Sequence, residues 1–185
     1  MLKNIRLVMV LLVICGIAYP FLMTGVSQVI MPAKADGSLI RNESGEIIGS
    51  ELIGQSFKDP SYFHGRISSI NYDAAGSGTP NYSPSNEEMV ERTKKDIAEF
   101  LKANPTIDKE DIPADLMTNS GSGLDPNVSP QGALVQVSRI AKERDLSEKS
   151  LINLIDKFTE GRSLGLFGEP RVNVLKLNIA LDELK

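Results

Sequence analysis

The chain has 185 residues, of which 41% are hydrophobic but only 5% are aromatic, a composition that predicts one small core and one compact domain. Its formal charge of -4 and its scattered Lys and Arg residues argue against nucleic acid as a partner. Because Cys15 is the only cysteine, the chain can form neither an internal disulfide nor a cysteine-based zinc site.

The first predicted element is a membrane helix over residues 7–31, an uncharged run of 25 residues. At about 1.5 Å per residue, such a helix reaches roughly 37 Å, whereas the hydrocarbon core of a bilayer is about 30 Å thick. Pro20 should bend this helix without ending it, because leaving the helix would expose unpaired backbone groups to lipid.

Two alternatives to a retained membrane anchor arise from the same region. Ala33-Lys34-Ala35 resembles the cleavage site of a signal peptide, but the apolar run exceeds the about 7 to 15 residues of a signal sequence. Cys15 is a candidate lipoprotein cysteine, but the bulky Ile14 precedes it and apolar residues continue after it. Retention as an anchor is therefore expected.

The orientation of the helix follows from its flanking positive charges. Lys3 and Arg6 lie close before it, whereas Lys34 and Arg41 are spaced more widely after it, so the amino terminus is predicted to be cytoplasmic. The predicted organisation is a cytoplasmic tail (1–6), a transmembrane helix (7–31), a linker (32–37) and an extracytoplasmic domain (38–185).

The domain is expected to begin with β-structure and a long loop. Residues 38–40 and 46–49 flank a polar stretch that contains Gly45, and this arrangement predicts a β-hairpin. Residues 52–57 are expected to extend the sheet until Pro60 stops it. Residues 68–86 are rich in Gly, Ser, Asn and Pro and predict a long loop, which is usually functional or ordered by a partner.

Two helices are predicted from their amino-terminal signals. Residues 85–88 read as a capping box, and apolar residues then recur at helical spacing until Asn104-Pro105. Ser129 is the predicted N-cap of the next helix, with Pro130 at its first position. The apolar stripe of this second helix comprises Ala133, Leu134, Val137, Ile140 and Ala141.

The carboxy-terminal part is predicted to hold a third helix, a strand and a short final helix. Ser147 should cap the third helix, and Gly161 should end it in a left-handed conformation. Residues 172–177 alternate as a strand does, and residues 179–184 are expected to form the final helix. The predicted fold is thus one N-terminal transmembrane helix followed by a single small extracytoplasmic α+β domain.

The loop between Thr118 and Pro130 and the acidic residues just before it lack the patterns of phosphate and metal sites. A phosphate-binding loop needs a lysine directly after its glycines, but no lysine follows Gly123 before Lys142. Asp125 would also repel an anion at the start of the following helix. The acidic residues at 108–111 lack the spacing of a calcium loop, so no metal site is predicted.

A serine nucleophile at Ser122 is the alternative with chemistry of its own. The motif G-x-S-x-G is absent, and the only histidine, His64, lies on the other side of the long loop. A membrane-anchored extracytoplasmic serine hydrolase that uses Ser122 therefore remains the alternative function, and a serine between two glycines is more often a turn residue.

The favoured interpretation is a stiff turn that docks a partner or supports the structure, with no catalytic residue. On the helix that follows, Gln136, Arg139 and Glu143 are expected on the face opposite Leu134, Val137 and Ala141. There they would either extend the contact or form a solvated face. The candidate residues are Ser120, Gly121, Ser122, Gly123, Asp125, Pro126, Ser129, Gln136 and Arg139.

Four stretches resemble one known family over nearly the whole chain. TNSGSGLDPNVSP (118–130) and GEPRVNVLKLNIAL (168–181) resemble the C chain of the Kdp-type potassium-transporting ATPase, and GSELIGQSF (49–57) and YFHGR (62–66) look like two further blocks of that family.

The resemblance implies a non-catalytic accessory subunit of a high-affinity, ATP-driven potassium import complex. Its partners would be the potassium-translocating chain, the ATP-hydrolysing chain and the lipid bilayer. The resemblance also implies support of assembly and of nucleotide use by the ATP-hydrolysing chain, as a catalytic chaperone. An association with ATP rests on this resemblance alone, and no cofactor is predicted from the residues themselves.

Overall fold

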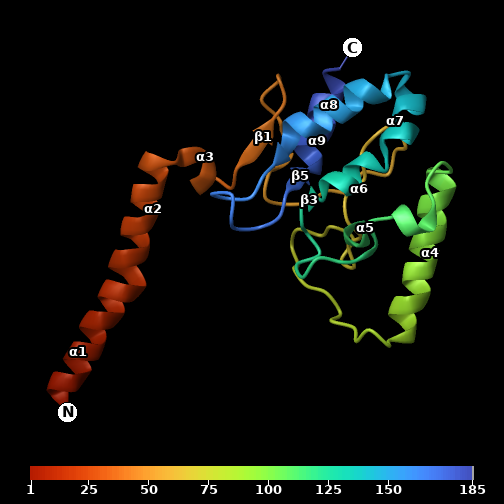
Figure 1. The fold of residues 1–185 in the computed structure, drawn as a ribbon. Helices are drawn as coiled ribbons and strands as arrows, with labels where there is room; N and C mark the ends of the chain where they lie inside the picture. The colour runs from red at the N-terminus through yellow and green to blue at the C-terminus, as the bar shows by residue number, and fades with distance from the viewer. Residues whose placement is uncertain (185) are drawn as a thin grey trace. The chain divides into compact units, whose positions relative to one another are not determined.

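The computed structural model describes residues 1–184 and divides the chain into two compact units, with the boundary between Ser50 and Glu51 (Figure 1). The first unit holds the long apolar helix and a β-hairpin, and the second holds a mixed arrangement of helices and short strands. The fold is therefore α+β with a long apolar N-terminal helix, as the sequence predicts.

The N-terminal helix runs without interruption from Leu2 to Ile30 and is long and apolar enough to cross a membrane. It consists of α1 (Leu2–Val13), a π-helical turn η1 (Ile14–Ala18) and α2 (Tyr19–Ile30). In the π turn the backbone N–H of Tyr19 donates to the carbonyl of Ile14, five residues earlier. Because Pro20 has no N–H and its ring crowds the carbonyl four residues before it, a wider turn accommodates the proline inside a continuous helix.

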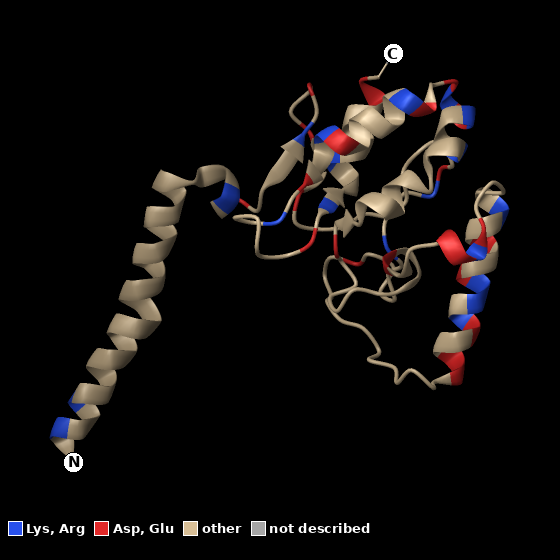
Figure 2. Cartoon of the chain, in the orientation of Figure 1, with Lys and Arg blue, Asp and Glu red and all other residues tan. Residues whose placement is uncertain are grey.

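Figure 2 shows that the charged residues of this helix lie only near its amino-terminal end. The rest of the first unit comprises α3 (Pro32–Ala35) and an antiparallel hairpin of β1 (Leu39–Arg41) and β2 (Ile47–Ser50). The predicted hairpin is thus confirmed.

The predicted extension of the sheet over residues 52–57 is wrong, because this segment forms no strand. Its backbone instead approaches the loop at Asp125: a Cβ on Gly54 would lie 2.6 Å from the Asp125 carbonyl oxygen. Phe57 packs beside Tyr62, with their ring centroids 5.7 Å apart. A tertiary contact therefore overrides the local β-propensity of the segment.

Residues 68–86 are irregular, as predicted, and lead into α4 (Glu87–Ala103). The side chain of Asn86 caps this helix by accepting a hydrogen bond from the backbone N–H of Met89. Two short elements follow: a 3-10 turn η2 (Lys109–Asp111) and α5 (Ala114–Met117).

The helix predicted to begin at Pro130 is two helices, α6 (Pro130–Leu134) and α7 (Val137–Arg144). Its start is confirmed, since the Ser129 side chain accepts from the backbone N–H of Gly132. The break lies at Val135 and Gln136, whose ψ angles of -10° and -8° depart from the helical value of about -42°. Helix α7 ends at Asp145, which adopts the left-handed conformation at φ 55°.

Helix α8 (Glu148–Phe158) begins at the predicted cap Ser147 but does not end at Gly161. It ends where Thr159–Glu160 becomes strand β4, which pairs with β5 (Arg171–Asn173). Strand β5 is the centre of a three-stranded antiparallel sheet whose other edge is β3 (Asn127–Val128). The left-handed end predicted for Gly161 is therefore wrong.

The strand predicted over residues 172–177 is too long, because α9 (Val174–Asp182) begins inside it. The side chain of Asn173 accepts from the backbone N–H of Lys176 and so caps this helix. The core of the unit lies among α7, α8, α9 and β5, and its fully buried side chains include Phe63, Ile140, Leu151, Ile155, Val172, Leu177 and Leu181.

Candidate functional site

The loop from Thr118 to Pro130 is held by the backbones of segments far from it in sequence. Three of its carbonyl oxygens accept hydrogen bonds from residues before it: Leu124 from the Gly54 N–H at 2.8 Å, Gly123 from the Ser68 hydroxyl at 2.7 Å and Ser122 from the Gly78 N–H at 2.8 Å. The Pro126 carbonyl accepts from the Val174 N–H at 2.9 Å, on the other side. The loop is therefore an ordered, braced part of the unit.

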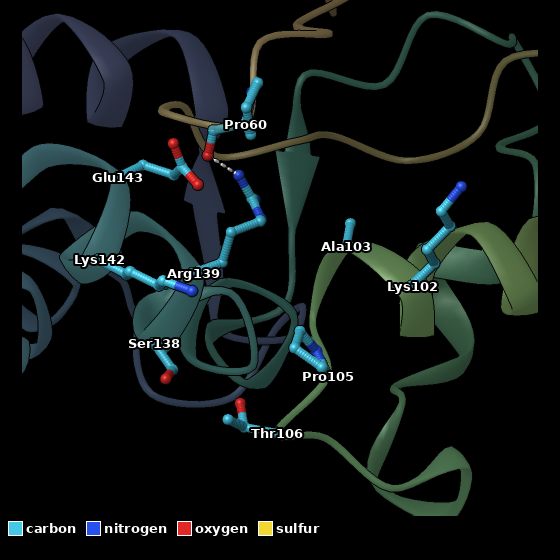
Figure 3. Close-up of a pocket in the computed structure, with 9 residues that line it drawn as sticks. All are labelled: Pro60, Lys102, Ala103, Pro105, Thr106, Ser138, Arg139, Lys142 and Glu143. Carbon is cyan, nitrogen blue, oxygen red and sulfur yellow. Dashed lines mark hydrogen bonds between the residues drawn. The ribbon is translucent and has the colours of Figure 1, made fainter.

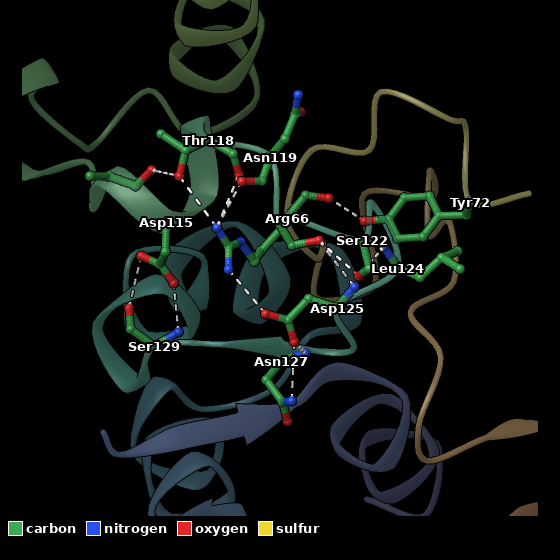
Figure 4. Close-up of polar contacts among 12 residues, drawn as sticks. Arg66, Tyr72, Asp115, Thr118, Asn119, Ser122, Leu124, Asp125, Asn127 and Ser129 are labelled. Atoms are coloured by element: carbon green, nitrogen blue, oxygen red, sulfur yellow. Dashed lines mark hydrogen bonds and ion pairs between the residues drawn. The ribbon is translucent and has the colours of Figure 1, made fainter. Parts of the chain in front are cut away.

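Arg66, from the predicted YFHGR block, extends into this loop (Figure 4). One guanidinium nitrogen donates to the Asp125 carboxylate at 3.0 Å, and another donates to the Asn119 carbonyl at 3.2 Å. A planar guanidinium can hold both groups at fixed angles, which an ammonium cannot do. Arg66 therefore fixes the two ends of the Ser/Gly turn relative to each other.

Gly123 is the residue of the turn that has to be glycine. Its φ of +72° lies in the left-handed region, and an added Cβ would meet the Ile70 side chain at 2.8 Å and the Gly78 carbonyl oxygen at 3.0 Å. Gly121 differs: it is exposed, its φ is not positive, and an added Cβ would meet nothing within 4 Å.

The end of the loop is joined to α5 through Asp115. This carboxylate accepts from the Ser129 N–H at 2.6 Å and from the Ser129 hydroxyl at 3.1 Å, while that hydroxyl caps α6 (Figure 4). A carboxylate thus already occupies the position at the helix start where a phosphate would be bound. The geometry offers no cradle for an anion here.

Ser122 and His64 have their hydrogen bonds within separate segments. The Ser122 hydroxyl accepts from the Leu124 N–H at 3.1 Å and lies 3.4 Å from the Ser120 hydroxyl. The His64 ring donates to the Asp59 carbonyl at 3.0 Å. Burial, followed by the nearby Arg139 charge, lowers the pKa of His64, so its neutral form is favoured. Ser122 is therefore a turn residue, and His64 is a packed side chain that is not hydrogen-bonded to it.

The expectation that Gln136 and Arg139 lie on an open helix face is wrong. Gln136 is 0% exposed and Arg139 is 7% exposed. The Gln136 amide accepts from the His64 N–H at 2.8 Å and donates to the His64 carbonyl at 3.1 Å. It also accepts from Arg139 at 2.8 Å. Both residues therefore belong to an internal polar network.

Arg139 extends this network to the start of the YFHGR block and to the end of α4. It donates to the carbonyls of Pro60 (Figure 3) and Tyr62, the latter at 3.0 Å, and to the Asn104 side chain at 3.1 Å. Desolvation lowers the pKa of Arg139 to about 10, which leaves the guanidinium charged at neutral pH.

Asn178 completes the attachment of this segment, and no local sequence pattern indicates its role. Its side-chain oxygen accepts from the Phe63 N–H at 2.9 Å, and its amide nitrogen donates to the Phe63 carbonyl at 2.9 Å. Residues 62–66 form no strand, so their buried backbone groups are paired with the side chains of α7 and α9. Because these partners are far apart in the sequence, no local pattern predicts their pairing.

Only part of the loop is accessible to solvent. Thr118 and Gly121 are exposed, and Ser122, Asp125 and Pro126 are half-buried. Beside them lies an open hollow with charges of both signs, lined by Arg66, Asp115, Asp125, Glu169 and Arg171 among others. No group of three His, Cys, Asp or Glu side chains in residues 1–184 is arranged to hold a metal ion.

A long apolar helix that could cross a membrane, followed by a small α+β domain, is the arrangement of a membrane-associated protein with one N-terminal helix. A family model described as the c chain of K+-transporting ATPase (KdpC) matches residues 1–183. A potassium-transporting ATPase KdpC subunit of Bacillus cereus is 55% identical over 180 residues, which cover 97% of this chain and 93% of the relative.

A KdpC subunit of Bacillus anthracis is 53% identical over the same shares of both chains. The chain belongs to the KdpC family, and it is a non-catalytic subunit of the Kdp potassium-transporting ATPase complex.

Proposed function

We propose that the chain acts as a membrane-anchored assembly subunit whose domain lies outside the cytoplasm and whose partners are the potassium-translocating and ATP-hydrolysing chains. The observation that carries the proposal is the apolar helix Leu2–Ile30, which has Lys3 and Arg6 at its start and a complete folded unit after it. Positive charges favour the cytoplasmic side, so the folded unit follows on the other side.

This topology determines how the chain supports the use of ATP. ATP is cytoplasmic, and on the proposed topology only residues 1–6, before the uncharged run 7–31, are cytoplasmic. The domain therefore aids nucleotide use indirectly, by stabilising the assembled complex through its helix and its outer surface. The bilayer is the third partner, and nucleic acid is not one.

Within the domain, the loop 118–129 is the proposed docking surface. Its backbone is fixed by Gly54, Ser68, Gly78 and Val174, and so binding would cost little additional ordering. The contact is made by the exposed Thr118 and Gly121 and by the half-buried Ser122, Asp125 and Pro126, whereas Ser120 is buried beneath them. Gln136 and Arg139 act behind this surface, as supports.

Two measurements on the full chain test this function. A tagged chain solubilised in detergent should recover the partner chains of the transporter. Protease added to intact protoplasts should digest the domain while leaving the amino-terminal residues protected. A domain that survives outside protease and is digested only after lysis would contradict the topology, and a chain recovered without partners would contradict the assembly role.

A further inference from the structure

A cavity of about 400 Å³ lies in the second unit, between the end of α4 and helix α7 (Figure 3). Helix α7 forms one wall, and the last residues of α4 with the turn that follows form the other. The polar and charged side chains that line it are those of Lys102, Thr106, Ser138, Arg139, Lys142 and Glu143. None of them belongs to the loop 118–129.

The wall formed by α7 contains a buried positive charge that no carboxylate neutralises. Arg139 is the one buried arginine of residues 1–184. Its guanidinium donates to neutral groups, the carbonyls of Pro60 and Tyr62 and the side-chain oxygens of Asn104 and Gln136. No carboxylate oxygen of the described residues lies within 4.0 Å of it, whereas an ion pair is formed by each of Arg66, Arg92, Arg144, Arg162 and Arg171. Neutral acceptors satisfy the N–H groups of Arg139 but leave its charge without a counter-ion, which is costly in a buried position.

Two further cations of the cavity lack an anionic partner. Lys102 and Lys142 are exposed, and within residues 1–184 neither ammonium group forms an ion pair. Glu143 is the only acidic residue that lines the cavity, so the three cations leave a net charge of +2 there, in a chain whose formal charge is -4. The hydroxyl groups of Thr106 and Ser138 add two hydrogen-bond donors. The cavity therefore favours an anion.

The free donors fit a phosphate group better than a carboxylate. The planar fork of Arg139 is already engaged by four neutral acceptors, so it cannot form the two parallel bonds by which arginine recognises a carboxylate. The ammonium groups of Lys102 and Lys142 act as point charges, and lysine in that role is a common phosphate ligand. With two hydroxyl donors beside them, they can each approach a different oxygen of a tetrahedral group.

The size and walls of the cavity indicate that the phosphate is part of a larger molecule. A water molecule takes up about 30 Å³, so a cavity of about 400 Å³ has room for more than a bare ion. Pro60, Ala103 and Pro105 supply an apolar surface for carbon atoms. No aromatic ring lines the cavity, so it offers a nucleotide base no surface for stacking.

We propose that this cavity binds the phosphate group of a small phosphate ester, with Lys102 and Lys142 as its ligands and Arg139 as a fixed positive charge beside them. Glu143 opposes the bound anion and limits the affinity. A soluble ester such as glycerol phosphate and the headgroup of an anionic phospholipid present the same group, and the experiment below distinguishes them.

The first measurement is the protection of lysines from an amine-reactive reagent, followed by mass spectrometry on the full chain in maltoside micelles, which contain no phosphate. At constant ionic strength, glycerol 1-phosphate should slow the labelling of Lys102 and Lys142 and leave Lys149, an exposed lysine of α8, unchanged. Acetate at the same concentration should protect neither lysine. Equal protection by acetate would overturn the proposal, because it would show screening in place of a phosphate site.

Two substitutions of exposed residues should shift this binding in opposite directions. Lys142→Gln should raise the glycerol phosphate concentration that half-protects Lys102 by about tenfold, and Glu143→Gln should lower it by about threefold. Lys149→Gln makes the same charge change outside the cavity and should have no effect. A loss of affinity in Glu143→Gln, or unchanged affinity in Lys142→Gln, would overturn the proposal.

The source of the phosphate is tested with the full chain in lipid nanodiscs. Slower labelling of Lys142 in discs of phosphatidylglycerol than in discs of a galactolipid, which has no phosphate, assigns the headgroup as the ligand. Protection by glycerol 1-phosphate alone assigns a soluble ester. Protection by neither probe would overturn the proposal and leave the assembly role standing, because recovery of the partner chains does not depend on this cavity.

Discussion

Gln136 pairs with the backbone of His64 as one strand residue pairs with another, accepting from its N–H at 2.8 Å and donating to its carbonyl at 3.1 Å. The two residues are separated by 72 positions, and the glutamine is completely buried. One side chain thus takes the place of a strand partner for the segment that carries Arg66, and through Arg66 it supports the braced loop.

Removing that amide should destabilise the domain strongly. Gln136→Leu leaves the N–H and the carbonyl of His64 without their partner and removes one of the acceptors of Arg139, which should cost about 2–4 kcal/mol of unfolding free energy. Denaturant unfolding of the full chain in detergent, followed by circular dichroism, measures the loss. Gln131→Leu, at an exposed position of α6, is the control and should change stability by about 0.5 kcal/mol or less. Equal effects of the two substitutions would refute the supporting role of Gln136.

Arg66 should be replaceable by lysine only in part. Lysine can keep the charge opposite Asp125 but loses the second contact to the Asn119 carbonyl, and the pair is partly exposed, so the stability loss should be about 1 kcal/mol or less. The clearer effect should be local, with faster amide hydrogen exchange from Asn119 to Asp125 than in the wild type. Unchanged exchange in Arg66→Lys would show that Arg66 does not brace the turn.

The Ser129 hydroxyl should stabilise the domain by more than a helix cap alone does, because it also donates to the Asp115 carboxylate. Ser129→Ala removes the bond to the Gly132 N–H and one of the bonds to Asp115, so a loss of about 1–2 kcal/mol is expected. Ser129→Asp keeps an N-cap acceptor but faces the Asp115 carboxylate and should also destabilise. If Ser129→Asp has the same unfolding free energy as the wild type, the contact between Ser129 and Asp115 does not stabilise the fold.

His64 should make stability depend on pH in mildly acidic solution. Its folded pKa is lowered from 6.5 by burial, so the unfolded chain takes up a proton first as pH falls. The contribution of neutral His64 to the unfolding free energy is therefore fully present above pH 6.5. It should decline as the pH falls from 6.5 toward the lower pKa of the folded state. Comparison of unfolding free energy at pH 7.5 and pH 5.5 measures the decline, which should be smaller in His64→Gln. The same decline in that variant would assign it to other groups.

The features that the sequence predicts correctly are those encoded by neighbouring residues. Ser129 and Ser147 cap helices because each side chain reaches an N–H three residues later, and the hairpin at 39–50 closes over a few polar residues. Only the local sequence has to be read in these cases.

The features that were missed depend on partners far along the chain. Residues 52–57 leave the sheet because Gly54 meets the loop at Leu124, and Gln136 and Arg139 turn inward because the segment at 60–64 lies against α7. A polar residue on a helix is predicted to face solvent unless its distant partner is known. Asn178, whose role depends on Phe63, gave no local signal for the same reason.

The proposed docking role of the loop at 118–129, without chemistry of its own, is distinguished from a catalytic role by one pair of substitutions. Ser122→Ala removes the only serine that was a candidate nucleophile, whereas Gly121→Arg adds a long side chain at an exposed position where no neighbouring atom lies within 4 Å of an added Cβ. Asn153→Arg, on the exposed side of α8, controls for the added charge.

The measurement is potassium-stimulated ATP hydrolysis together with subunit recovery, in the complex assembled from each variant. We expect Ser122→Ala and Asn153→Arg to keep both properties, and Gly121→Arg to fold normally but to lose recovery and activity together. A fully assembled Ser122→Ala complex without activity, or a Gly121→Arg complex indistinguishable from the wild type, would contradict the docking role.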